Sequence, residues 1–400
     1  MPDVLQGIQG ILLYAASFVV VLSVVVFVHE FGHFQVARWC KVAIDTFSIG
    51  FGKTLLGWRD KQGVEWKVGA LPLGGYVKFT DDADAMSTGP REKIEDPAAM
   101  AEARRKGLFH AQPLSSRAMV VAAGPITNFI FSILAFAALT LIIGRTSPVP
   151  ARLAEIQADS AAGVGGLQAG DIVRSANGEE ITNFMALQSV IGRSANQQLA
   201  LQVERNGQLT PITVTPRPSP GGEGLPRAGR GMLGVTGPLV LDEERVYQRY
   251  GLVDSLVWGA KDTWGIVAQT GAYIGAIFSG RESGDQIAGP LGIINVSGQV
   301  AEGALGGDEI GWPEKLQRLG LALLNLAAVL SVAVGFVNLL PIPILDGGHL
   351  LFYAIEALRG GKPIPAAAQE WAYRAGFAVM ASLFLFATWN DITRLLPGAG

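Results

Sequence analysis

The sequence predicts a multi-pass α-helical membrane protein with four spans, a small membrane-associated β-sheet and one separate α+β domain. Hydrophobic residues make up 49% of the 400 residues and charged residues only 16%, which favours membrane spans joined to soluble parts. Four stretches with little or no charge are each long enough to cross a bilayer. Between the second and the third of them, the composition changes to that of an ordinary soluble domain.

The first span, expected within residues 1–40, ends in a metal-binding pattern. Residues 4–28 contain no charged residue and are followed by His29-Glu30-Phe31-Gly32-His33. Residues four apart share one face of a helix, so two imidazoles can bind one cation. In this pattern the glutamate is the general base and not a ligand. The alternative is a chance match, which is expected about twice in a thousand such sequences. A cluster of ionisable residues at the end of a span also indicates a functional site.

The flanks of the first span predict its orientation. Residues 1–10 contain no Lys or Arg and the apolar run is too long for a signal peptide, so we expect a retained span. Basic residues follow this span and precede the next one, which favours an outer N-terminus and a cytoplasmic loop. These residues are Arg38, Lys41, Arg104, Arg105, Lys106 and Arg117.

The region 41–116 is expected to form this cytoplasmic part. Within it, residues 45–79 form short runs separated by glycine, and apolar and polar residues alternate at 64–68. This pattern predicts a small β-sheet beside the first helix. An exposed strand edge could hold an unwound substrate by strand addition; the alternative is an ordinary hairpin. Residues 81–110 predict a polar loop with a short helix, in which His110 lies on the surface.

The second span, 117–145, contains Ala123-Gly124-Pro125-Ile126-Thr127-Asn128 near its start. Small residues here permit close helix contact. The amide of Asn128 either pairs with groups near the metal site or only joins two helices.

The soluble domain is expected at 148–218. The run from Leu167 through Asp171 and Ile172 to the Asn177-Gly178 turn resembles a bacterial PDZ domain. This resemblance implies a module that binds a peptide or a chain end beside a strand, and the order of spans places it in the periplasm. Residues 219–317 are expected to hold a linker and periplasmic interfacial amphipathic helices. Residues 252–279 could alternatively form a fifth span, and 280–311 are expected to be irregular.

The third span, 318–356, breaks at Asn338-Leu-Leu-Pro341-Ile-Pro343-Ile-Leu-Asp346-Gly347-Gly348-His349. Backbone groups freed by a break at membrane depth must be satisfied by protein or by a water-filled cavity. An aspartate in such a break needs a partner, and a cation is the natural one. Asp346 is therefore the favoured third ligand, since two histidines and a carboxylate form a known zinc set; His349 is the alternative. The fourth span is expected at 370–396.

Charge and cysteine content argue against nucleic-acid binding and against structures that depend on several cysteines. The net charge of −3 with scattered basic residues gives no indication of nucleic-acid binding. The single Cys40 excludes an intramolecular disulfide and a cysteine-rich zinc site.

Taken together, these motifs resemble the site-2 protease family, close to its RseP-type bacterial intramembrane zinc metalloproteases. The resemblance implies one Zn²⁺ per chain held by His29, His33 and Asp346, with Glu30 as general base. It further implies that Asn338 lies near the substrate or the oxyanion. It also implies a substrate-presenting strand formed by Phe47, Ser48, Ile49, Gly50, Phe51 and Gly52.

The resemblance further implies the bacterial inner membrane as location, with the active site near the cytoplasmic face. The expected substrates are single-span membrane proteins after a first cleavage, such as anti-sigma factor stubs and remnant signal peptides. Some relatives carry two PDZ domains, whereas one clear copy is present here. The rival functions are an ion-coupled membrane transporter, which would use the broken helix for ions, and a membrane-anchored PDZ scaffold; both leave Glu30 unexplained.

Overall fold

A computed structural model describes residues 2–80, 96–146, 150–221, 228–237, 247–282, 284, 287–307 and 310–395. Two structural units are present. The first comprises Met1–Thr140 and Gly251–Ala399, and the second comprises Leu141–Tyr250, so the second unit is inserted into the first along the chain.

Four helices among the described residues are long and apolar enough to cross a membrane. They are α1 (Pro2–Trp39), α3 (Leu114–Ile143), α8 (Trp312–Asn338) and α10 (Ala366–Leu395). Their sequences are apolar on most faces, as expected where a helix is surrounded by lipid and other helices. The chain is a multi-pass membrane protein, and the length and composition of these helices confirm the prediction of four apolar spans.

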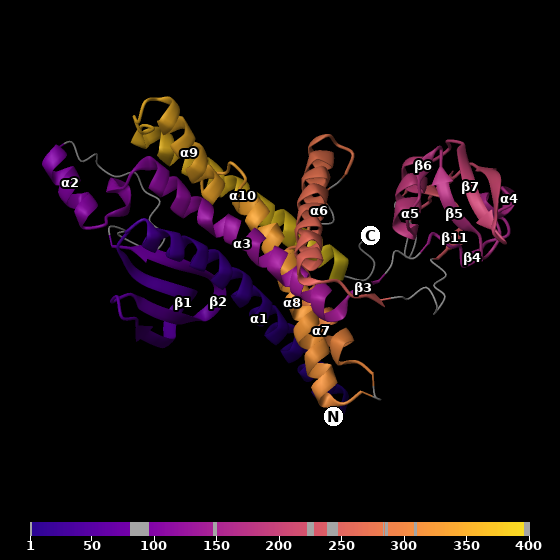
Figure 1. The fold of residues 1–400 in the computed structure, drawn as a ribbon, viewed down its shortest axis with the longest axis horizontal. Coiled ribbons are helices and arrows are strands. Elements are labelled where there is room, and N and C mark those ends of the chain that lie inside the picture. Colours follow the sequence, from indigo (N-terminus) through magenta and orange to yellow (C-terminus); the bar gives the residue numbers. More distant parts are fainter. Residues whose placement is uncertain are drawn as a thin grey trace. The chain divides into compact units, whose positions relative to one another are not determined.

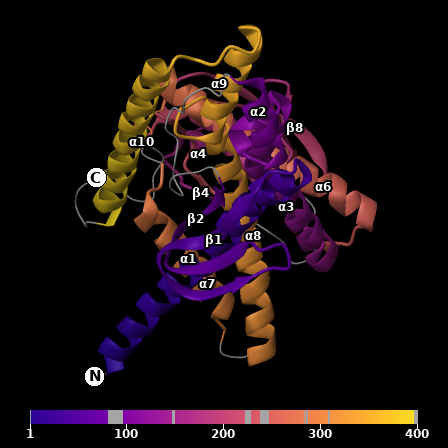
Figure 2. The same ribbon diagram turned by 90° about the vertical axis from the view of Figure 1, so that its left-hand side faces the viewer.

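Helix α8 packs against both α1 and α3. Val21 and Val25 of α1 form one buried cluster with Leu326 and Ala327 of α8. A second cluster joins Phe136 and neighbouring residues of α3 to Ala328 and Val332, on the same helix α8. Small side chains on α8 permit this close packing, which Figures 1 and 2 show as α1, α3 and α8 lying side by side.

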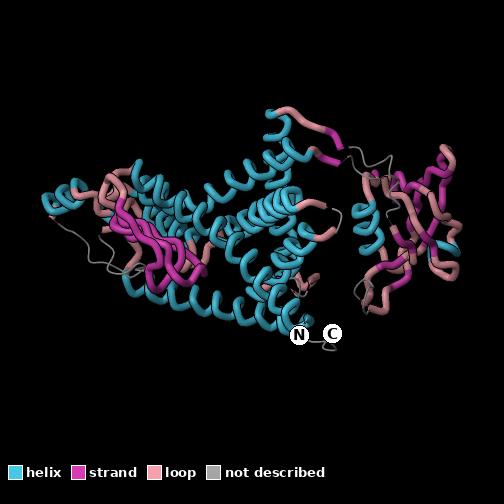
Figure 3. The backbone as a smooth tube through the Cα atoms, turned by 90° about the horizontal axis from the view of Figure 1, so that it is seen from below, coloured by secondary structure: helices cyan, strands magenta, loops and turns pink. Residues whose placement is uncertain are grey.

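Strands β1 (Ile44–Arg59) and β2 (Glu65–Phe79) form an antiparallel sheet beside α1. Phe47 and Val64 pack with Phe34 of α1 in a buried cluster, so the apolar face of the sheet is fixed to the helix that carries the His-Glu-x-x-His pattern. Figure 3 shows both strands in magenta beside the helices. The small sheet predicted from the sequence is present.

The remaining helices of this unit are shorter or more polar. They are α2 (Pro97–Arg105), the 3₁₀ helix η1 (Phe109–Ala111), α6 (Leu252–Phe278), α7 (Pro290–Leu305) and α9 (Asp346–Leu358). Helix α6 is one continuous helix and is not among the four candidate spans of the described chain.

The expectation that 280–311 is irregular was wrong, because α7 occupies the middle of this segment. Its start is capped by the buried carboxylate of Asp391 from α10, which accepts hydrogen bonds from the backbone N–H of Gly289 at 3.0 Å and Gly292 at 2.9 Å. Gly298 then lies so close to α1 that a Cβ would be 1.9 Å from the ring of Tyr14. Contacts with other helices therefore stabilise a helix that its own sequence does not favour.

The second unit is built around a four-stranded sheet with strand order β6-β5-β7-β8. Leu187 of helix α5 packs on Leu199, Leu201 and Val203 of β7 in its core. The strands of the sheet are β5 (Ile172–Ala176), β6 (Glu179–Glu180), β7 (Leu199–Arg205) and β8 (Gln208–Val214), and the helices are α4 (Ala161–Val164) and α5 (Phe184–Arg193).

Three short strand pairs complete this unit and extend it beyond residue 218. They are β4 with β11 (Glu155–Ile156 and Val235–Thr236), β9 with β10 (Arg217–Pro218 and Gly231–Met232) and β3 with β12 (Arg145–Thr146 and Tyr247–Gln248). The last pair joins the two ends of the inserted unit, since Thr146 is directly opposite Tyr247.

Candidate active site

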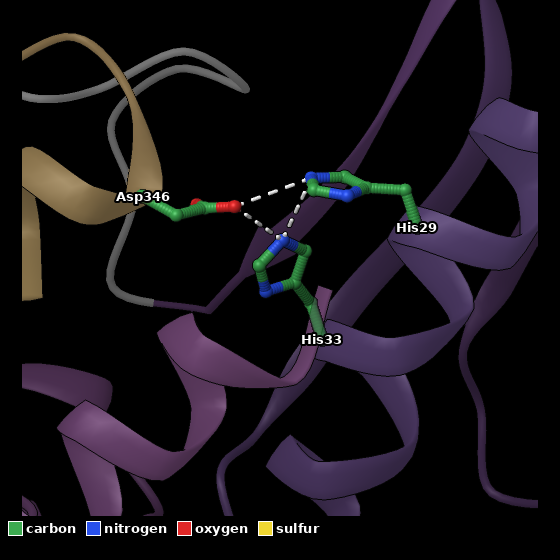
Figure 4. Close-up of side chains that lie close together, drawn as sticks. All are labelled: His29, His33 and Asp346. Carbon is green, nitrogen blue, oxygen red and sulfur yellow. Dashed lines mark hydrogen bonds and ion pairs between the residues drawn. The ribbon is translucent and has the colours of Figure 1, made fainter. Parts of the chain in front are cut away.

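His29, His33 and Asp346 converge although they come from opposite ends of the sequence (Figure 4). The two Nε2 atoms of the histidines are 3.2 Å apart. Asp346 Oδ2 lies 3.3 Å from Nε2 of His29 and 3.5 Å from Nε2 of His33. The structure thus brings the predicted pair and the favoured third residue together.

Asp346 reaches the histidines because α8 ends at Asn338 and α9 begins at Asp346 itself. The two following glycines let the first turn of α9 fold against the connecting loop. A Cβ on Gly347 would lie 2.3 Å from the carbonyl oxygen of Leu339, and one on Gly348 would lie 2.3 Å from that of Ile342. Side chains at these positions would push α9, and with it Asp346, away from α1.

The hydrogen bonds of the histidines determine which ring nitrogens are free. Nδ1 of His33 lies 2.9 Å from the carbonyl oxygen of Val120. A carbonyl only accepts, so Nδ1 carries the proton and Nε2 presents its lone pair toward Asp346. This is the tautomer that a metal-binding histidine requires.

Asn128 determines the tautomer of His29 in the same way. Its amide lies 3.2 Å from Nδ1 of His29, and its Oδ1 is buried without a hydrogen-bond partner among the described residues. A half-turn of the amide, whose two ends have nearly the same shape, lets Oδ1 accept the Nδ1–H proton. Nε2 of His29 then also presents a lone pair, and the buried oxygen gains a partner.

The donor set fits a zinc ion. Two nitrogen lone pairs and a carboxylate face one another, and Asp346 Oδ2 is buried without a hydrogen-bond partner in the described part of the chain. Tetrahedral ligands at about 2.0–2.1 Å from zinc lie about 3.3–3.4 Å from one another. The three observed separations of 3.2, 3.3 and 3.5 Å agree with these edges.

Close packing of α3 against α1 leaves no room for a larger residue beside the two imidazole rings. A Cβ on Gly124 would lie 2.3 Å from Nε2 of His33 and 2.8 Å from Cε1 of His29. Gly32 is equally close to α3, since its Cβ would lie 2.5 Å from the carbonyl oxygen of Ala123. The small residues at 123–128 predicted close helix contact, and the structure adds Gly124 to the site.

Glu30 lies beside the converging side chains and is not one of the three whose ligand atoms meet. It is partly buried on α1 and faces β2, because a Cβ on Gly75 would lie 2.9 Å from Cγ of Glu30. Strand β2 therefore passes beside the side chain that the sequence assigns as general base.

The structure places the other candidates away from the three ligand atoms. The ring of His349 packs against Phe352 and against Tyr373 of α10, with ring centroids 6.4 and 5.9 Å away. His110 is exposed in η1. Asn338 is the partly exposed last residue of α8, and no hydrogen bond within the described chain links it to the histidines.

The expected substrate-presenting strand is not a sheet edge along most of its length. Because β2 bends back on itself, residues 46–49 of β1 pair on both sides: Phe47 is opposite Val77 and also opposite Trp66, and Ile49 is opposite Gly75 and Val68. Phe47, Ser48 and Ile49 therefore do not form a free strand edge, and their contact with substrate stays a prediction. Residues 75–79 of β2 pair only with β1 within the described chain, so their other side is an edge.

Four apolar helices and a zinc-type donor set beside a glutamate define a membrane metalloprotease. The family model for Peptidase family M50, the site-2 protease family, matches residues 17–383, and the chain belongs to this family. The predicted family, enzyme class and zinc cofactor are confirmed.

Similar proteins agree with this assignment. A protein of Agrobacterium fabrum named as zinc metalloprotease Atu1380 is 40% identical, with 96% of each chain covered. Metalloprotease MmpA of Caulobacter vibrioides is 38% identical, again with 96% of each chain covered. Regulator of sigma-E protease RseP of Salmonella typhimurium is 28% identical over 96% of this chain and 100% of its own length. The transporter and scaffold alternatives find no support in these names.

Proposed function

We propose that this zinc metalloprotease hydrolyses a peptide bond within or near the transmembrane segment of single-span membrane proteins that another protease has already shortened. The observation that carries the proposal is the convergence of His29, His33 and Asp346 beside Glu30. Both histidines belong to the candidate span Gln9–Trp39, which supports a site at membrane depth.

The chain's own residues divide the chemistry between them. His29, His33 and Asp346 would hold the zinc ion, which when bound supplies Lewis-acid activation of the scissile carbonyl and of water. Glu30 accepts a proton from the attacking water and returns it to the leaving amine. The Val120 carbonyl and Asn128 keep both histidines in the metal-binding tautomer.

The substrate has to be unwound before it can react, because a helix hides its peptide bonds in its own hydrogen bonds. The edge formed by residues 75–79 can hold the unwound segment by strand addition. This edge begins at Gly75, beside Glu30, so a segment paired there runs past the general base. Gly50, Phe51 and Gly52 follow the interior part of β1, and the ring of Phe51 stacks on Tyr76 of this edge with the centroids 6.0 Å apart. Asn338 remains a proposed contact for the substrate or the oxyanion.

The inserted unit is proposed to be a PDZ-like module that binds a peptide or a chain end and controls access. Its four-stranded sheet with α5 packed on it supports this view. The distribution of basic residues supports a periplasmic position for this unit and an active site near the cytoplasmic face of the bacterial inner membrane. By analogy with the relative named as a regulator of sigma-E, substrates would include anti-sigma factor stubs, and remnant signal peptides are a second class.

The test is cleavage of a purified single-span stub by the reconstituted full chain. Product should form with wild type and with Glu314→Gln, which changes an exposed glutamate paired with Arg318. Product should be lost with Glu30→Gln, although this variant still binds zinc, and with wild type after chelation. Cleavage that survives Glu30→Gln would place the catalytic base elsewhere.

A further inference from the structure

We propose that a basic cavity at the end of α1 binds the phosphate of an anionic phospholipid headgroup. The cavity has a volume of about 470 Å³, and its lining includes Gln35, Arg38, Trp39, Lys41, Arg105 and Lys106. It lies outside the converging ligands of the active site, and the inference does not depend on the proposed substrate class.

The cavity exists because the end of α1 meets the end of α2. Lys41 lies two residues after the end of α1 and has a positive φ of 58°, which turns the chain away from the helix axis. The backbone N–H of Ala43 then donates to the carbonyl of Gly107 at 2.8 Å. Gly107 allows this approach, since a Cβ there would lie 2.8 Å from the carbonyl oxygen of Lys41.

The charges in the cavity do not cancel. Arg38 is paired with Asp60, and Lys106 is paired with Glu102 at 2.8 Å. Lys41 and Arg105 are exposed and have no acidic partner within the described chain. Two uncompensated cations in one cavity favour an anion, and a phosphodiester oxygen accepts hydrogen bonds from both kinds of side chain.

The position of the cavity along α1 indicates a lipid rather than a free anion. The candidate span is 31 residues long, so its last residue lies about 22 Å from its middle, beyond the half-thickness of about 15 Å of a hydrocarbon core. That residue, Trp39, is 71% exposed, as is usual for tryptophan at a membrane interface. A headgroup bound here would direct its acyl chains along α1 toward the uncharged part of this helix, which ends at residue 28.

The experiment measures lipid retention by the full chain in micelles containing equal amounts of phosphatidylglycerol and phosphatidylcholine, using native mass spectrometry. Wild type should retain phosphatidylglycerol preferentially. The variant Lys41→Asn with Arg105→Gln should bind it about tenfold more weakly, since each basic residue near an anionic lipid contributes measurably. Asparagine is chosen because it tolerates the positive φ of position 41.

Matched variants decide whether the cavity is responsible. Lys53→Gln with Lys362→Gln removes two exposed charges elsewhere and should retain the lipid as wild type does. Lys41→Arg with Arg105→Lys preserves the charge and should also retain it. Equal retention by the cavity variant and the Lys53/Lys362 variant would overturn the proposal. Displacement by glycerophosphoglycerol, the headgroup without chains, at matched concentration would overturn the assignment to a lipid.

Discussion

Arg117, near the start of α3, and Glu356, near the end of α9, form a two-point ion pair with distances of 2.7 Å (Nη2 to Oε1) and 3.4 Å (Nη1 to Oε2). Their side chains are only 15% and 13% exposed. The guanidinium also lies over the ring of Tyr353, 5.0 Å from its centroid. Because α9 begins with Asp346, this pair fixes the helix of the third ligand to the helix that carries Gly124.

Glu356→Leu should therefore destabilise the protein and weaken zinc binding. The change leaves the Arg117 charge buried without its partner, which typically costs about 3 kcal/mol or more. Thermal unfolding in detergent and zinc content after dialysis measure the two effects. Glu314→Gln, which breaks an exposed pair, should cost less than about 1 kcal/mol. Equal effects of the two variants would show that the buried pair does not hold α9.

Gly124→Ala should impair zinc binding and lower the cleavage rate by about 100-fold, the usual effect of displacing a reacting group by about 1 Å. The added methyl would overlap Nε2 of His33, so one ring has to move. Gly320→Ala on α8 is the control, since nothing lies within 4 Å of its Cβ. Normal zinc content with normal cleavage in Gly124→Ala would contradict the packing described here.

Gly75→Ala should lower cleavage by about tenfold or more while the zinc content stays unchanged, because the three atoms nearest to the methyl would be the Ser48 carbonyl oxygen at 2.8 Å and carbons of Glu30 and Val26 at 2.9 Å, none of which belongs to a metal ligand. Gly57→Ala, in the outer part of β1, places its methyl no closer than 3.3 Å to a neighbour and should cleave as wild type does. Steady-state cleavage of the stub and metal analysis distinguish the two effects. Loss of zinc from Gly75→Ala would mean that β2 supports the ligands themselves.

The turn between β1 and β2 should loosen at low pH. Burial raises the pKa of Asp60, but hydrogen bonds from Gln62 N, Trp66 Nε1 and Val64 N, together with Arg38, lower it below its ordinary value of 3.8. The carboxylate therefore stabilises the turn above that value, and this contribution is lost as the pH falls below it. Hydrogen-exchange protection of Gln62 and Val64 should fall accordingly. Asp60→Ala, which removes both carboxylate oxygens, should show the low protection already at pH 7, and unchanged protection in this variant would contradict the assignment.

Removal of the inserted unit should preserve cleavage of a short stub to within about tenfold. Thr146 and Tyr247 are partners in the β3/β12 pair, so an Asn-Gly turn can join them directly. The shortened chain is assayed with the same stub and, in parallel, with a substrate that still has its outer domain. Simultaneous loss of zinc and of stub cleavage would show that the unit is needed for folding.

The metal site could be predicted from the sequence because each part of it is a short, local sequence pattern. The spacing of His29 and His33 places both side chains on one face of a helix. The break before Asp346 places a carboxylate at the start of the next helix. Helix α7 was missed since its stability comes from Tyr14 and Asp391, residues far away in the sequence. The double pairing of residues 46–49 depends on how β2 bends, and strand register across a bend is not encoded by alternation alone.

Insertion of a complete unit between α3 and α6 also affects the timing of synthesis. His29 leaves the ribosome early, whereas Asp346 follows only after the whole inserted unit and the three helices α6, α7 and α8 have been made. At about 5–20 residues per second this interval lasts tens of seconds. Throughout it, the growing chain lacks its carboxylate ligand and cannot cut neighbouring proteins while it is being placed in the membrane.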